Sequence, residues 1–188
     1  MKLRNCRYLS RDILTGLIQP GDTVVDATAG NGHDTLFLAQ SVGPEGRVYA
    51  FDVQPDALRS TKERLGKEGC LDGRVSLILD GHENMERYVA GPVRCVLFNL
   101  GWLPSGDHGV TTRTPTTLLA VEAAMRLVAP GGMVSVCIYP GHEEGARERD
   151  ALMDRLKDVD IRKYNVLSAN FLNQKNAPPQ LILIQREQ

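Results

Sequence analysis

Two acidic residues, each at the end of an apolar run, are the first candidates for chemistry in this 188-residue chain. The first run, Thr23–Val25, ends in Asp26 and leads into a glycine-rich turn, Gly30-Asn31-Gly32, and a helix-like pattern. A second apolar run, Val48–Phe51, ends in Asp52. A strand, glycine turn and helix in this order present backbone N–H groups to a nucleotide-like ligand, and an acid ending the next strand can bind a ribose diol. The pattern predicts a site for a nucleoside cofactor.

The charge beside the turn indicates which cofactor this is. A dinucleotide fingerprint reads G-x-G-x-x-G, but Thr35 occupies the third glycine position. Asp26 would repel a pyrophosphate and suits a ligand with a cationic end, such as S-adenosyl-L-methionine; the alternative is a turn whose glycines serve only tight geometry. The residues expected to bind this cofactor are Asp26, Thr28, Gly30, Asn31, Gly32, Asp34, Thr35, Asp52, Val53, Gln54, Asp80, Gly81, His82 and Asn99.

Length and composition fit one domain, residues 1–188, with 42% hydrophobic residues. No apolar run approaches the ~20 residues that span a bilayer, so we expect no membrane contact. The four cysteines are scattered and form no ligand cluster, which predicts buried thiols in the cytoplasm and no metal. A net charge of −1 argues against strong non-specific nucleic-acid binding, but a local patch suffices for RNA. The basic candidates for such a patch are Lys2, Arg4, Arg7 and Arg11.

Strand and helix patterns alternate along the chain. We expect strands over residues 23–27, 47–52, 74–79, 93–98 and 133–138, and helices over 33–42, 55–67, 83–89, 116–128 and 143–157. Another helix, with Ser10 as its N-cap, precedes Pro20-Gly21, and a hairpin over 161–170 and 181–184 closes the chain. The alternation predicts an α/β fold with a mostly parallel, doubly wound seven-stranded sheet and one antiparallel strand from the C-terminal hairpin. Ligands of such sheets bind at the carboxyl ends of the strands.

A second informative stretch, Phe98–His108, begins at one of these carboxyl ends. The side-chain oxygen of Asn99 can accept a hydrogen bond from an attacking amine, and the carbonyl of Leu100 or Gly101 can accept another. This resembles the Asn-Pro-Pro-aromatic motif of amino-group methyltransferases, in which acceptors orient the amine in line with the leaving sulfur. Trp102 is then placed to stack on a base, unless it is a core aromatic.

The remaining candidates each have a plainer interpretation. Asp107 and His142 are candidates for removing a proton, although His142 also fits the start of a helix, as does His82. Asp80 also fits a simple turn acid. Arg113 suits a phosphate or carboxylate, and Thr114 or Thr116 suits a helix cap. The residues expected to contact substrate are Trp102, Leu103, Pro104, Arg113 and Tyr139, and those expected to be catalytic are Asn99, Gly101, Asp107 and His142.

Several motifs together resemble the MnmM/YtqB family, long labelled "putative rRNA methylase". They are D-A-T-A-G-N-G-H-D-T at 26–35, F-N-L-G-W-L-P-S-G-D at 98–107, the threonine-rich segment to Thr117, P-G-G at 130, Y-P-G-H at 139–142 and N-x-x-N-A-P-P at 173–179. Trp102 departs from the tyrosine expected there, which keeps base stacking but removes a hydroxyl.

The resemblance implies a Rossmann-like class I S-adenosylmethionine-dependent methyltransferase. Its expected substrate is the amine of 5-aminomethyluridine at the tRNA wobble position, and its partner is the tRNA anticodon stem-loop; a homodimer is compatible with it. The alternatives are methylation of rRNA, of a small-molecule amine or of a protein amine, and a non-catalytic cofactor-binding module. The Asn99 loop argues against the last of these.

Overall fold

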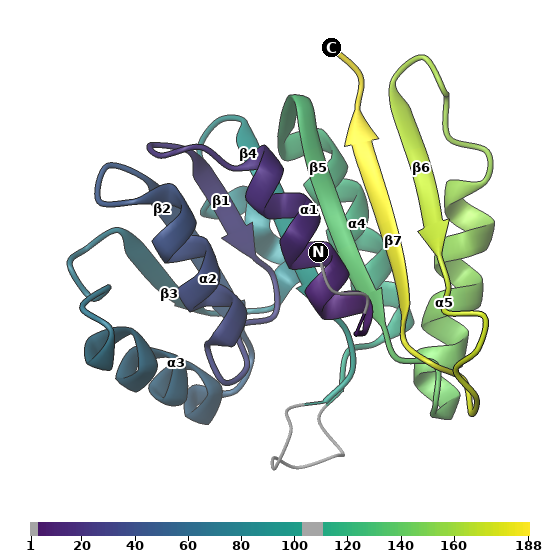
Figure 1. The fold of residues 1–188 in the computed structure, drawn as a ribbon, viewed down its shortest axis with the longest axis horizontal. Coiled ribbons are helices and arrows are strands. Elements are labelled where there is room, and N and C mark those ends of the chain that lie inside the picture. The colour runs from purple at the N-terminus through teal and green to yellow at the C-terminus, as the bar shows by residue number, and fades with distance from the viewer. Residues whose placement is uncertain (1–3, 103–110) are drawn as a thin grey trace.

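One seven-stranded sheet, in the order β3-β2-β1-β4-β5-β7-β6, organises the computed structural model over the residues that it describes, 4–102 and 111–188 (Figure 1). The strands are β1 (Thr23–Asp26), β2 (Arg47–Asp52), β3 (Val75–Leu79), β4 (Val93–Asn99), β5 (Val128–Ile138), β6 (Tyr164–Ala169) and β7 (Gln180–Arg186). β1 to β5 pair in parallel, whereas β7 runs antiparallel to both β5 and β6. The predicted α/β fold and its antiparallel C-terminal strand are confirmed.

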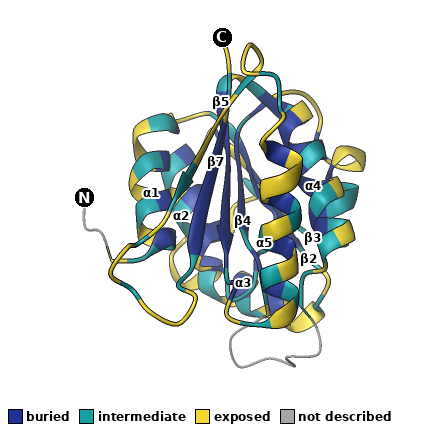
Figure 2. Cartoon of the chain, turned by 90° about the vertical axis from the view of Figure 1, so that its right-hand side faces the viewer, coloured by how far each residue is buried: buried dark blue, intermediate teal, exposed yellow. Residues whose placement is uncertain are grey.

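Helices cover both faces of this sheet. They are α1 (Cys6–Leu17), α2 (His33–Val42), α3 (Pro55–Lys67), α4 (Thr114–Leu127) and α5 (Glu143–Leu156), with a 3-10 helix η1 (His82–Arg87). α1, α2 and α3 lie on one face, and α4 and α5 lie on the other (Figure 1). Because the central strands are covered on both faces, they consist mostly of buried aliphatic residues (Figure 2).

The starts of α1, α4 and β5 differ from the sequence predictions in ways that have a physical reason. α1 begins at Cys6, because the side chain of Asn5 caps it by accepting from the Tyr8 N–H at 3.1 Å. Ser10 is therefore not the cap; it is buried inside the helix, and its hydroxyl lies 2.6 Å from that of Ser135 on β5. α4 begins at Thr114 after Arg113, with no side-chain cap, so neither predicted threonine caps it.

The third difference concerns β5, which begins at Val128 although a strand was predicted only from residue 133. Val128 pairs with Val93, and a register shift follows before Met133 pairs with Cys95. The P-G-G segment lies within this irregular stretch and does not separate the strand from α4. No helix in the described ranges is long and apolar enough to cross a membrane.

Candidate active site

A cleft of about 570 Å³ opens at the carboxyl ends of the parallel strands. Asp52 and Asn99 end β2 and β4, Asp80 directly follows β3, and all three line the cleft. Parallel strands bring their carboxyl ends to one edge of the sheet, so the topology gathers residues that are distant in the sequence. The volume lies within the range of small-molecule sites, roughly 300–1,000 Å³.

The glycine turn after β1 forms one wall of the cleft, and α3 supports it. Gly30 and Gly32 have φ values of 54° and 75°, which favour glycine. A Cβ atom at Gly32 would lie 2.7 Å from the Cα of Thr61 on α3, so the close approach also requires glycine. The Thr61 hydroxyl donates to the Gly30 carbonyl at 3.1 Å, and Arg64 Nε donates to the Asn31 carbonyl at 2.7 Å. These contacts fix the direction in which the turn presents its backbone.

Asp26 lies beneath this turn and is fully buried. Its Oδ1 accepts from the Thr28 N–H at 3.1 Å, and its Oδ2 accepts from the Thr35 hydroxyl at 2.6 Å. Burial, assisted by the nearby charge of Asp34, raises the pKa of Asp26 to about 7. Asp26, Gly32 and Thr35 do not lie among the residues that line the cleft. The position of Asp26 therefore does not support the predicted contact with a cationic ligand group. Asp26 lies beneath the glycine turn and stabilises it through its hydrogen bonds to Thr28 and Thr35.

As the pH rises from about 4 to about 7, we expect the free energy of unfolding of the parent protein to fall because of Asp26. The Asp26→Asn variant should lack this fall. The unfolded chain releases this proton near pH 3.9, whereas the folded chain retains it up to about pH 7, so stability falls by up to ~1.4 kcal/mol per pH unit in that window. Above the folded pKa both states are ionised and the loss stops growing. Asparagine keeps an acceptor for Thr28 and offers a donor to the Thr35 hydroxyl. Denaturant unfolding across this window checks the prediction, and equal pH slopes for parent and variant would contradict it.

Two further carboxylates line the cleft. Asp52 Oδ2 accepts from the Gly30 N–H and its Oδ1 accepts from the Gln54 N–H, both at 2.9 Å, while burial raises its pKa. Asp80 accepts from the Tyr88 hydroxyl at 2.8 Å, which lowers its pKa, and from the Asn84 amide at 2.9 Å. Each carboxylate oxygen has two lone-pair directions, so Asp52 retains acceptor capacity for a ligand after binding the backbone.

Apolar surface completes this half of the cleft. Val53, which follows β2, is 58% exposed and lines the cleft beside the buried Phe51. The His82 ring packs edge-on against Phe98 at 5.6 Å between centroids, and burial lowers the pKa of His82. His82 is the first residue of η1, so the interpretation that placed it at the start of a helix is confirmed, although it also lines the cleft.

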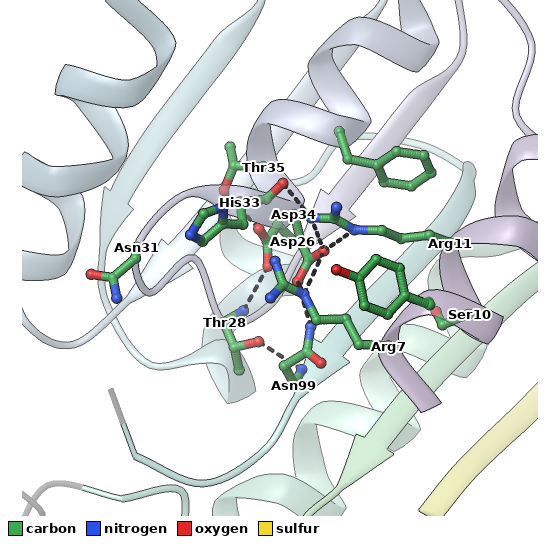
Figure 3. A network of polar contacts seen from close by, with 12 residues as sticks. Arg7, Ser10, Arg11, Asp26, Thr28, Asn31, His33, Asp34, Thr35 and Asn99 are labelled. Carbon is green, nitrogen blue, oxygen red and sulfur yellow. Dashed lines mark hydrogen bonds and ion pairs between the residues drawn. The ribbon is translucent and has the colours of Figure 1, made fainter. Parts of the chain in front are cut away.

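Asn99 is held at both its backbone and its side chain (Figure 3). Its N–H donates to the Thr28 hydroxyl at 2.8 Å, and its Nδ2 donates to Asp34 Oδ2 at 2.7 Å. Because a carboxylate only accepts, the amide nitrogen of Asn99 must face Asp34. Its Oδ1 is buried and has no hydrogen-bond partner among the described residues. A buried acceptor without a hydrogen bond costs roughly 1–3 kcal/mol of stability, so Oδ1 is well suited to accept a hydrogen bond from a ligand.

Arg7 and Arg11 also bind the carboxylate of Asp34 (Figure 3). They lie one turn apart on α1; Arg7 Nε donates to Asp34 Oδ2 at 3.0 Å, and Arg11 is ion-paired with Oδ1 and donates to the His33 carbonyl. The sequence prediction that Arg7 and Arg11 serve RNA phosphates is not supported by these contacts, because both guanidinium groups are engaged by Asp34. Lys2 lies outside the described residues.

The opposite end of the cleft contains two rings. Trp102, 38% exposed, lies with its ring centroid 4.4 Å from that of His142. His142 caps α5, since its Nδ1 accepts from the Gly145 N–H at 3.1 Å. The interpretation of His142 as a residue that starts a helix is confirmed, and its Nδ1 is not free to take a proton. Tyr139 also lines this end, and burial raises the pKa of its hydroxyl.

A series of hydrogen bonds, which could not be predicted from the sequence, fixes the segment after β4. Gly101, at a φ of 116°, donates its N–H to the Thr112 hydroxyl at 2.8 Å, and that hydroxyl donates to Glu148 at 3.0 Å. Glu148 is almost fully buried and also accepts from Thr117 at 2.6 Å, while burial raises its pKa. The only sequence signal was the threonine-rich segment, whose members pair with an acid from α5.

Most of the predicted site residues share this one cleft. It is lined by Thr28, Gly30, Asn31, Asp34, Asp52, Val53, Gln54, Asp80, Gly81, His82, Asn99, Gly101, Trp102, Arg113, Tyr139 and His142. Leu103, Pro104 and Asp107 lie outside the described residues. Arg7, Thr111 and Thr112 also line the cleft but were not predicted as ligand-binding residues there.

This sheet order, its antiparallel β7 and a cleft beside the glycine turn define a class I S-adenosylmethionine-dependent methyltransferase. More particularly, the chain belongs to the family described as "Putative rRNA methylase", whose family model matches residues 48–185.

Solved structures and a curated relative agree with this membership. The chain is 45% identical to a "putative rRNA-methylase" from Clostridium thermocellum, with a TM-score of 0.96 over 99% of this chain and 100% of that one. It is 36% identical to a "putative methyltransferase" from Streptococcus mutans in complex with SAH, with a TM-score of 0.88 over 98% and 99% of the two chains. It is 38% identical over 180 residues to the chloroplastic "tRNA (mnm(5)s(2)U34)-methyltransferase" of Arabidopsis thaliana, covering 91% of this chain and 66% of that protein's length.

Proposed function

We propose that the whole chain is one catalytic domain that transfers a methyl group from S-adenosylmethionine to the amine of 5-aminomethyluridine at the wobble position of tRNA. The observation that carries the proposal is the buried, unpartnered Oδ1 of Asn99 at the end of β4, in the same cleft as the glycine turn. The name of the Arabidopsis relative supports this substrate, and the family's description supports RNA more broadly.

The residues at the glycine-turn end fit the cofactor. Asp52 retains acceptor positions for a ribose diol, and Val53 offers apolar surface to the adenine base. Asp80 also lines this part of the cleft, and we assign it to the adenine amino group. Gly30 and Asn31 line the cleft, and we assign their backbone to the methionine end. When bound, S-adenosylmethionine supplies an electrophilic methyl group on a sulfonium that leaves as a neutral thioether.

Asn99 then orients the nucleophile. Its Oδ1 accepts one N–H of a neutral primary amine, which directs the nitrogen lone pair along a defined line. A protonated amine has no lone pair to donate, so the amine must lose a proton before or during capture. His142 is not placed to accept that proton through Nδ1, which already accepts from Gly145. Asp107 stays a prediction for this role.

Trp102 and Arg113 mark the substrate end of the cleft. Trp102 lines the cleft and is 38% exposed, and we assign it to stack on a flipped-out base of the substrate. Arg113 is exposed, lines the cleft and precedes α4, and these observations support its assignment to a backbone phosphate. With Arg7 and Arg11 paired to Asp34, Arg113 becomes our principal phosphate candidate.

We expect Arg113→Ala to weaken tRNA binding severalfold and to lower the salt dependence by about one phosphate contact, with cofactor affinity retained. Arg162→Ala is the matched control, because Arg162 is exposed, pairs with Asp160 and precedes β6 at the opposite edge of the sheet. Filter binding or fluorescence anisotropy at several salt concentrations measures both variants. Equal salt slopes for Arg113→Ala and the parent would place the phosphate contact elsewhere.

Mass spectrometry of wobble nucleosides tests the substrate. tRNA from a strain that lacks this protein should carry the unmethylated aminomethyl nucleoside, and incubation with purified protein and S-adenosylmethionine should convert it to the methylated form. Methylation confined to rRNA or to a small-molecule amine would support the alternatives named above and overturn the tRNA assignment.

A further inference from the structure

Asp34 lines the cleft, and three side chains of the protein bind its carboxylate. Arg7 and Arg11 of α1 contact its two oxygens, and Asn99 Nδ2 donates to Oδ2 at 2.7 Å (Figure 3). The side chain of Asp34 is only 9% exposed, while those of Arg7 and Arg11 are 34% and 24% exposed. These donors use most of its lone-pair directions, so little capacity remains for a cofactor ammonium.

We propose that Asp34, clamped by Arg7 and Arg11, is a positioning residue that sets which end of the Asn99 amide is offered to the substrate. This inference rests on the proposed function, because it concerns the acceptor that orients the amine. It also gives α1 a part in the reaction, although α1 lies outside the residues that the family model matches.

The chemistry of the amide explains why such a clamp is needed. The two ends of an asparagine side chain are nearly equal in shape, but one end donates and the other accepts. With Nδ2 toward the substrate, Asn99 would donate a hydrogen bond and compete for the lone pair that must attack the methyl group. A carboxylate cannot donate, so Asp34 selects the orientation that leaves Oδ1 without a partner.

The arginines hold the Asp34 carboxylate in place. Its oxygens accept from Arg7, from Arg11 and from Asn99 at once. Arg11 further donates to the His33 carbonyl, and its guanidinium lies 5.2 Å from the Phe37 ring centroid. α1 is thereby fixed against the first turn of α2, where Asp34 lies.

The test is a double-mutant cycle between Asp34→Ala and Asn99→Ala, followed by single-turnover methyl transfer. We expect Asp34→Ala to slow transfer at least about tenfold, and the double variant to be no slower than Asn99→Ala alone, because Asp34 acts through Asn99. S-Adenosylmethionine affinity should stay within about threefold of the parent. Additive losses, an unchanged rate for Asp34→Ala, or a tenfold loss of cofactor affinity would each overturn the inference.

Asp22→Ala is the matched control, because Asp22 forms a comparable, partly buried pair with Arg94 at the amino ends of β1 and β4, whereas the cleft lies at the carboxyl ends. It should leave the transfer rate unchanged. Asp34→Asn serves as a second variant if the alanine variant does not fold. An asparagine there can either accept from or donate to Asn99 and so no longer selects one amide orientation, which should slow transfer severalfold. A rate for Asp34→Asn equal to that of the parent would overturn the inference.

A readout without turnover separates this inference from the proposed function. The side-chain amide protons of Asn99 should shift in the NMR spectrum of Asp34→Ala and stay in place in Asp22→Ala. If the parent methylates no RNA amine but these resonances shift, the proposed function fails while the clamp stands. If the parent is active and the resonances do not move, the clamp is refuted.

Discussion

Replacing Asn99 by alanine is expected to lower the single-turnover rate of methyl transfer by at least about a hundredfold while leaving cofactor affinity nearly unchanged. The variant removes the acceptor at Oδ1 that aligns the amine, and loss of one positioned hydrogen-bonding group or a displacement of ~1 Å costs on this scale. The cofactor end of the cleft is built from the glycine turn, Asp52 and Asp80, which the substitution does not touch. The measurement is rapid-quench transfer at saturating cofactor and RNA.

Asn165→Ala provides the matched control for this substitution. Asn165 is exposed on the edge strand β6 and interacts with Glu187, away from the cleft. Its loss should leave the transfer rate unaffected. An Asn99→Ala rate within about threefold of the parent, under ~0.7 kcal/mol of barrier, would rule out amine orientation by Asn99.

The second large effect is expected from Asp52→Ala, which should weaken S-adenosylmethionine binding tenfold or more. A ribose diol would donate two hydrogen bonds to this carboxylate, each worth ~1.5–3 kcal/mol when the acceptor is charged, and tenfold in affinity is ~1.4 kcal/mol. The variant also frees the Gly30 N–H, which Asp52 binds at 2.9 Å, and so loosens the turn. Isothermal calorimetry measures the affinity directly.

Two further variants serve as comparisons for Asp52→Ala. Asp52→Asn keeps an acceptor for the backbone but loses the charge, so its affinity should fall between those of the parent and the alanine variant. Asp150→Ala removes an exposed carboxylate of α5 that pairs with its neighbour Arg149, and it should bind cofactor as the parent does. Parent-like affinity in Asp52→Ala would remove Asp52 from the ribose site.

Elements with strong local signals could be predicted from the sequence. α2, β2 and α3 have the predicted bounds, because Pro55 starts α3 at its first turn and Gly43 ends α2 with a φ of 67°. The α1 start was missed because Asn5 and Ser10 are both good caps, and only tertiary packing of Ser10 against Ser135 decides between them. β5 extends through a proline and two glycines because Val128 pairs with Val93, which no local pattern indicates.

Some features of the site could likewise be predicted from the sequence, and others could not. The gathering of Asp52, Asp80 and Asn99 follows from parallel strands and was predicted correctly. The burial of Asp26 could not be read from its neighbours, because the strand-end position allows either a cleft-facing or a buried carboxylate. The pairing of Arg7 with Asp34 depends on how α1 docks beside α2, so the basic N-terminal residues were predicted as an RNA patch instead.

Methyl transfer to defined anticodon stem-loops tests whether the protein acts on the amine of 5-aminomethyluridine. One stem-loop carries 5-aminomethyluridine at the wobble position, a second carries the hydroxymethyl analogue and a third carries unmodified uridine, each with methyl-labelled S-adenosylmethionine and purified protein. We expect label on the aminomethyl stem-loop alone, attached to its amine nitrogen and lost in Asn99→Ala. Equal labelling of all three stem-loops, or label on a base or ribose atom, would contradict this expectation.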